Sequence, residues 1–309
     1  MTAQQINGKA LDNLSSQHWM NAQKLFFMNM KKHPSHQTYN NLGYYLISEG
    51  LICKNGKTRN ALKHGMKYLF KASKMETSVI NMCAIVKAID YQLRTAKEDE
   101  KSPLYAYACS CLKKAISIEC SNTLQYNYLR FSYLLEPHNE NILLEIRNLV
   151  HKFTSVETVS LYLELLCDNF LIDEGLECIE TYGDFLDEVD LLMFYAKFGL
   201  YEKGYVLCET ICNVYNIDAR IASAIIECCV NTFHLQEAKK YAEQIEEMEK
   251  EKQHINKENW CQYAFGNTES STNYRKIKIA EYKYIPPVID RCCYFGCNLH
   301  DIHWDFVIM

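Results

Sequence analysis

The chain has 309 residues, 48% hydrophobic and 23% charged, which is enough to bury a core in about two domains or one elongated array. Its formal net charge of −5 argues against a nucleic-acid partner, because phosphate binding needs an excess of clustered lysine and arginine. No apolar run approaches the ~20 residues that span a bilayer, and the N-terminus lacks the basic-then-apolar order of a signal peptide. The sequence therefore predicts a soluble, cytoplasmic protein that binds neither nucleic acid nor membranes.

The fifteen cysteines do not resemble a disulfide framework. Most are single residues on the apolar faces of predicted helices, where a reduced thiol acts as a small buried hydrophobe. We expect these cysteines to be free, and only the last three, near the C-terminus, depart from this pattern.

A small residue followed four positions later by a bulkier or equally small one recurs along the chain, in what would be the second helix of successive helix pairs. A small residue at such a point lets two helices approach closely, while its neighbour fills the adjacent groove. The positions, in chain order, are Ala22/Phe26, Gly65/Leu69, Ala108/Leu112, Gly175/Ile179, Gly204/Cys208 and Ala238/Ala242.

These positions resemble the tetratricopeptide repeat, whose two antiparallel helices carry W-x2-L-G-x2-Y and A-x3-F-x2-A. "NNLGYYLISEG" supplies Leu42 and Gly43, and "AQKLFFMNMKKHP" supplies Ala22, Phe26 and Pro34. The resemblance implies an all-α fold, a right-handed α-solenoid of about seven helix pairs. We assign it to residues 1–252, followed by a linker and a C-terminal tail over residues 253–309.

The first two repeat steps are longer than the family's 34 residues. The step from Ala22 to Gly65 and from Gly65 to Ala108 is 43 residues each time. The excess falls in two polar stretches, "ICKNGKTRN" and "RTAKEDEKSP", which we expect to project as loops.

The resemblance also implies where a partner binds, since first helices of the family face a concave groove. An asparagine amide there can donate to and accept from the backbone of an extended peptide. Asn41 lies two residues before Gly43, and Asn81 lies two residues before Cys83, so the two asparagines take equivalent places. We expect their amides to be exposed to a partner. The alternative is that they only cap turns or face solvent. Aromatic residues on first helices suit the same role, although core packing is an alternative for them. The candidate peptide-binding residues are Asn40, Asn41, Tyr44, Asn81, Tyr126, Tyr128 and Tyr162.

The C-terminal tail has a different composition. "YRKIKIAEYKYIPPV" alternates polar and apolar residues with period two, which predicts a half-buried strand ending at Pro286-Pro287. The fold class we expect is therefore all-α with a small β-containing or irregular segment at its C-terminus.

The final residues concentrate thiols and imidazoles, the ligands that a tetrahedral Zn²⁺ prefers. The predicted zinc ligands are Cys292, Cys293, Cys297, His300 and His303, at a spacing of C-x3-C-x2-H-x2-H from Cys293. This is not a common zinc-finger spacing. Packing of the tail onto the last helices, a redox-active disulfide and chemical modification are alternatives.

The function indicated by these features is a peptide- or protein-binding scaffold that uses the concave groove. One alternative is a peptide-sensing regulator without its own DNA-binding motif. Another is an accessory subunit or enzyme whose Cys/His cluster binds metal or is modified. No zincin, phosphate-loop or serine-elbow motif is present in the sequence, so an enzyme is the less favoured interpretation. The identity of the partner and the oligomeric state cannot be derived from the sequence.

Overall fold

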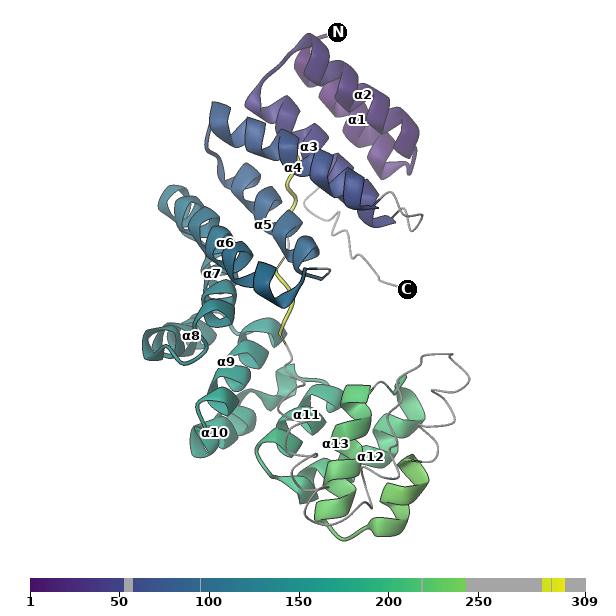
Figure 1. The fold of residues 1–309 in the computed structure, drawn as a ribbon, viewed down its shortest axis with the longest axis vertical. Helices are drawn as coiled ribbons and strands as arrows, with labels where there is room; N and C mark the ends of the chain where they lie inside the picture. The colour runs from purple at the N-terminus through teal and green to yellow at the C-terminus, as the bar shows by residue number, and fades with distance from the viewer. Residues whose placement is uncertain (53–57, 95, 218, 243–284, 290, 298–309) are drawn as a thin grey trace. The chain divides into compact units, whose positions relative to one another are not determined.

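The computed structural model describes residues 1–52, 58–94, 96–217, 219–242, 285–289 and 291–297. Within these ranges the fold is all-α, as predicted, and contains no strand (Figure 1). Residues 274–284, most of the predicted strand, lie outside the described ranges, and Ile285–Ile289 is irregular. The predicted boundary at residue 252 also lies outside them.

The helices form two compact units. The first comprises Met1–Pro137 together with Pro287–Met309, and the second comprises His138–Pro286. The first unit contains α1 (Ala3–Ser15), α2 (Trp19–Lys32), α3 (His36–Ile52), α4 (Thr58–Met75), α5 (Val79–Leu93), α6 (Glu98–Ile118) and α7 (Asn122–Leu135).

The second unit contains α8 (Glu140–Lys152), α9 (Val156–Asp168), α10 (Ile172–Tyr182), the 3₁₀ turn η1 (Gly183–Phe185), α11 (Glu188–Lys197), α12 (Tyr201–Val214) and α13 (Ala219–Asn231). Residues 235–242 are also helical. Within each unit, helices that are consecutive in the sequence pack against one another, which is the arrangement of a helical solenoid.

The predicted small residues lie where helices touch. A β-carbon on Gly65 of α4 would lie 2.5 Å from Ile47 Cγ1 and 2.7 Å from the carbonyl oxygen of Gly43 on α3. A β-carbon on Gly204 of α12 would lie 2.5 Å from the Cys228 sulfur on α13. The close helix contacts that the sequence predicted at these glycines are confirmed.

Four turns between paired helices contain a residue in the left-handed backbone region. These residues are Gln17 (φ 59°), Phe170 (φ 58°), Gly199 (φ 75°) and Phe233 (φ 63°). Each lies five residues before a small packing residue: Ala22, Gly175, Gly204 and Ala238. Glycine adopts this conformation without steric cost, whereas a phenylalanine does not. The two phenylalanines are also 85% and 88% exposed, so their side chains contribute little packing in compensation.

One predicted loop is instead largely helical. Residues 94–103 were expected to project, but α6 begins at Glu98 and includes Pro103. The Lys97 amide donates to Glu100 Oε2 at 3.1 Å, and Glu98, Asp99 and Glu100 place negative charge in the first turn. Such charge is favourable at a helix N-terminus, which explains why the polar stretch extends the helix. Residues 53–57 of the other predicted loop lie outside the described ranges.

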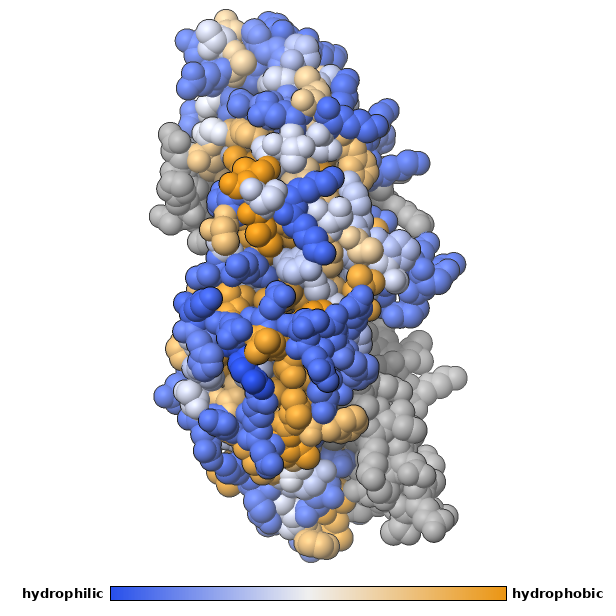
Figure 2. Space-filling model, turned by 90° about the vertical axis from the view of Figure 1, so that its left-hand side faces the viewer, coloured by the Kyte–Doolittle hydropathy of each residue, from blue (hydrophilic) through white to orange (hydrophobic). Residues whose placement is uncertain are grey.

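Hydrophobic residues on the face shown in Figure 2 occur in groups separated by hydrophilic side chains. None of the helices in the described ranges is both long and apolar enough to cross a membrane.

Candidate functional site: an asparagine-lined groove

The first unit binds a C-terminal part of its own chain across α3, α5 and α7 (Figure 1). Its described residues are 287–289 and 291–297, which are called the segment below. At one end of this segment, the Phe295 amide donates to Asn41 Oδ1 at 2.7 Å. The Phe295 carbonyl oxygen accepts from Asn41 Nδ2 at 3.0 Å and from Asn7 Nδ2 at 2.7 Å. Asn41 Nδ2 also donates to Asn7 Oδ1 at 2.7 Å. Side chains of α1 and α3 therefore bind the same carbonyl group of the segment together.

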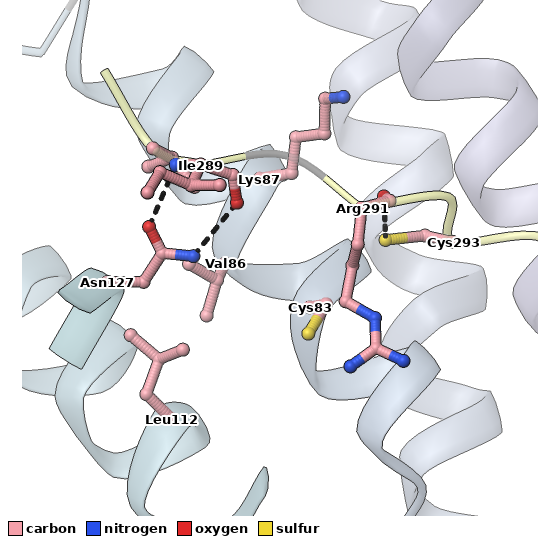
Figure 3. Close-up of a pocket in the computed structure, with 9 residues that line it drawn as sticks. Cys83, Val86, Lys87, Leu112, Asn127, Ile289, Arg291 and Cys293 are labelled. Atoms are coloured by element: carbon pink, nitrogen blue, oxygen red, sulfur yellow. Dashed lines mark hydrogen bonds between the residues drawn. The ribbon is translucent and has the colours of Figure 1, made fainter. Parts of the chain in front are cut away.

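At the other end, Asn127 of α7 makes the same two-way contact with Ile289. The Ile289 amide donates to Asn127 Oδ1 at 3.0 Å, and Asn127 Nδ2 donates to the Ile289 carbonyl oxygen at 3.0 Å (Figure 3). A side-chain amide used in this way matches one donor and one acceptor of an extended backbone. The contact therefore depends on the backbone of the segment and not on its side chains.

Asn41 and Asn127, which each bind a backbone amide and a carbonyl of the segment, occupy the same position in their helices. Asn41 lies six residues after Ser35, and Asn127 lies six residues after Ser121; each serine accepts from a backbone amide in the first turn of its helix. Two helix pairs separate α3 from α7, and six residues separate the two peptide units that are held. Six extended residues reach about 20 Å, which corresponds to two helix-to-helix steps of about 10 Å.

The residue before each asparagine also contacts the segment. Asn40 Nδ2 donates to the Cys293 carbonyl oxygen at 2.8 Å, and the Tyr126 hydroxyl donates to the Pro287 carbonyl oxygen at 2.9 Å. The fifth and sixth positions after the cap thus form a repeated binding pair on α3 and α7.

In α5, between these helices, the equivalent positions after its cap Ser78 are Cys83 and Ala84, which carry no amide. Between Ile289 and Phe295, the segment is held through a side chain instead. Arg291 forms an ion pair at 2.9 Å with Glu119, which lies at the C-terminal end of α6. Burial raises the pKa of the Cys83 thiol to about 12, and the nearby Arg291 opposes this rise. Cys83 is therefore a neutral, packed thiol.

Tyr294 is the buried anchor of the segment, with 4% exposure. Its ring stacks on Phe26 with a centroid distance of 5.7 Å and meets Tyr44 edge-on at 4.7 Å. Burial raises the pKa of the Tyr294 hydroxyl well above its usual value, and a hydrogen bond with Ser48 opposes that rise. The ring lies in an aromatic pocket formed by Phe26 and Tyr44.

The segment ends in a turn at Gly296, whose φ is 74°. A β-carbon at this position would lie 3.0 Å from Asn7 Nδ2, the atom that binds the Phe295 carbonyl oxygen. Glycine is thus favoured here both by the backbone conformation and by the close approach of Asn7.

A small cavity lies between the segment and the helices. It has a volume of about 10 Å³ and lies where Cys83, Leu112 and Asn127 face Ile289 and Arg291 (Figure 3). This volume is about that needed to hold a single water molecule.

The predicted groove residues divide into those that contact this segment and those that do not. Asn40, Asn41, Tyr44 and Tyr126 contact it. The equivalence of Asn81 with Asn41 was wrong, because counting from the capping serines makes Asn127 the equivalent residue. Asn81 Nδ2 instead donates to Asn40 Oδ1 at 3.0 Å and to the Leu69 carbonyl oxygen at 3.2 Å, and so orients Asn40.

The predicted exposure of the amides was also wrong, since Asn41 and Asn81 are each 1% exposed. Asn7 and Asn127 were not among the predicted groove residues. The position of Asn127, six residues after a helix-capping serine, was the available signal for it.

The two remaining tyrosines lie elsewhere. Tyr128 packs against the core of the first unit, with Lys113 Nζ 5.4 Å from its ring centroid. Tyr162 belongs to the second unit, where it accepts from Arg147 Nε at 2.9 Å and contacts Glu174. It lines an open cleft of about 660 Å³ between α8, α9 and α10.

The predicted zinc ligands are only partly described. Cys293 is buried and its thiol donates to the Arg291 carbonyl oxygen at 3.3 Å, while Cys292 and Cys297 are half-buried. Burial raises the pKa of Cys292 to about 11. Within the described ranges, no three His, Cys, Asp or Glu residues are grouped to hold a metal, and His300 and His303 lie outside those ranges. The zinc site stays a prediction.

No protein-family model matches the chain, and no curated protein matches it. The fold and the groove define the protein as an all-α helical-repeat protein with an asparagine-lined groove.

Proposed function

We propose that this protein is a peptide- or protein-binding module, and that the groove formed by α1, α3, α5 and α7 binds an extended segment of a partner. The observation that supports this most directly is the matched pair of bidentate contacts, Asn41 to Phe295 and Asn127 to Ile289. Both contacts address backbone atoms, so a segment of different sequence can make them equally well.

The asparagine amides of the groove are held in place before a ligand binds, which agrees with this role. The asparagine side chains that bind the segment come from helices whose own backbone hydrogen bonds are internal, so the groove does not depend on a sheet edge or a loop. Asn40 is held from behind by Asn81, at 3.0 Å, and Asn41 by Asn7, at 2.7 Å. Amides oriented in this way lose little freedom when they bind a ligand, which favours affinity.

A selection from a phage-displayed library of random peptides, with the full-length protein as bait, tests the proposal. The counter-variant is Asn41→Ala/Asn127→Ala, and the control is Asn122→Ala, an exposed asparagine on α7. We expect enriched peptides that bind the wild type and the control but bind the double variant at least tenfold more weakly. Peptides that bind all three proteins equally would contradict groove recognition.

A further inference from the structure

We propose that residues 287–297 act as a built-in competitor for the groove, and that the partner segment they mimic contains an arginine followed three residues later by a tyrosine, Arg-x-x-Tyr. This inference rests on the proposed function and specifies the ligand of the same groove. Arg291 and Tyr294 are the two residues of the segment that supply this pattern.

The segment is bound in the manner of a ligand. It is neither helix nor strand in the described ranges. Apart from the Arg291 carbonyl oxygen, which accepts from the Cys293 thiol, the backbone groups described above bond to side chains of helices 161 to 288 residues away in the sequence. Removing it would leave the backbone hydrogen bonds of α1, α3, α5 and α7 intact, because those bonds lie within the helices. The amides of Asn7, Asn40, Asn41 and Asn127 would then be available to another extended chain.

The specificity arises from two side-chain subsites between the backbone contacts. The first is the aromatic pocket of Phe26 and Tyr44, where one ring stacks on Tyr294 and the other meets its edge. The second is Glu119 at the C-terminal end of α6, which is 47% exposed and pairs with Arg291, 33% exposed. A partner with both residues in this register satisfies both subsites and both asparagine pairs together.

A covalently attached segment competes at a high effective concentration, so a partner in trans binds weakly until the internal segment is weakened. The test uses the full-length protein and a fluorescein-labelled peptide of residues 286–297, in which Cys292 and Cys297 are replaced by Ser. Fluorescence anisotropy measures its affinity for the wild type and for Tyr294→Ala. We expect at least tenfold tighter binding to Tyr294→Ala, whose internal segment has lost its anchor. Equal affinity, or no binding to either protein, would overturn the proposal.

A second experiment exchanges the charges of the Arg291–Glu119 ion pair and leaves the aromatic pocket intact. Arg291→Glu in the full-length protein removes the exposed ion pair without creating a cavity, and it too should bind the peptide more tightly than the wild type does. On the peptide, the same change should weaken binding to the wild type, whereas the Glu119→Arg protein should bind the changed peptide more tightly than it binds the unchanged one. Failure of this reversal would remove Glu119 as a subsite and would overturn the arginine preference.

The proposed function and this inference fail in different ways. Peptides selected by phage display that depend on Asn41 and Asn127 but show no preference for Arg-x-x-Tyr would leave groove recognition standing and refute the inference. A groove from which neither Tyr294→Ala nor Arg291→Glu releases the segment would identify residues 287–297 as a fixed part of the fold, which also refutes it.

Discussion

Replacing Asn127 by Ala should loosen the whole C-terminal segment. The change removes two hydrogen bonds of 3.0 Å to Ile289. At about 0.5–1.5 kcal/mol net for each bond, the segment should lose about 1–3 kcal/mol of the free energy that holds it in the groove. Because 1.4 kcal/mol corresponds to a factor of ten, local opening should become about 5- to 150-fold more frequent.

Amide hydrogen exchange, followed by mass spectrometry on the full-length protein, measures this opening. The Ile289 amide loses its acceptor directly, so the informative probe is the Phe295 amide at the far end, whose bond to Asn41 is untouched. If the segment opens as a unit, exchange at Phe295 should also accelerate about fivefold or more. Asn122→Ala is the control on the same helix and should change neither amide. Unchanged exchange at Phe295 in Asn127→Ala would refute the view that the segment binds and leaves the groove as one ligand.

Three further predictions concern the helices and their thiols. Gly65→Ala should destabilise the protein by about 1–3 kcal/mol in urea unfolding, because its β-carbon would overlap α3. Gly8→Ala should stabilise the protein by up to about 1 kcal/mol, because the added β-carbon would have no atom within 4 Å and alanine favours the helix. Similar losses of stability for both variants would contradict the close contact of α3 and α4 at Gly65. Phe170→Gly should raise stability by about 1 kcal/mol, since it relieves a left-handed backbone at an exposed side chain, and a loss would show that this ring packs. At pH 8 a thiol reagent should modify exposed Cys120 readily but Cys83, with its pKa raised to about 12, only after unfolding; rapid labelling of Cys83 would contradict its burial.

The helical fold could be predicted because small residues at close helix contacts leave a periodic trace. Gly65 and Gly204 were identified from spacing alone, and both lie where a β-carbon would clash. The extension of α6 through Pro103 was missed, because a polar, charged stretch is equally typical of a loop and of an acidic helix N-terminus.

The groove could be predicted only in part. Asn40 and Asn41 were identified, but counting from the packing glycine instead of the capping serine led to Asn81 and away from Asn127. The occupant could not be predicted at all, since Asn7 and Phe295 are 288 residues apart and no local pattern joins them. The thiols around Tyr294 indicated metal binding, whereas the described part of the segment packs an aromatic anchor between Phe26 and Tyr44.

Photo-crosslinking tests the central claim, groove recognition of an extended segment, most directly. A peptide of residues 286–297 with benzoylphenylalanine in place of Tyr294 would be irradiated with full-length Tyr294→Ala protein, and the crosslinked residues would be mapped by mass spectrometry. We expect crosslinks on α2 and α3 around Phe26 and Tyr44, and their loss when Asn41 and Asn127 are both replaced by Ala. Crosslinks confined to other helices, or unaffected by the asparagine changes, would contradict it.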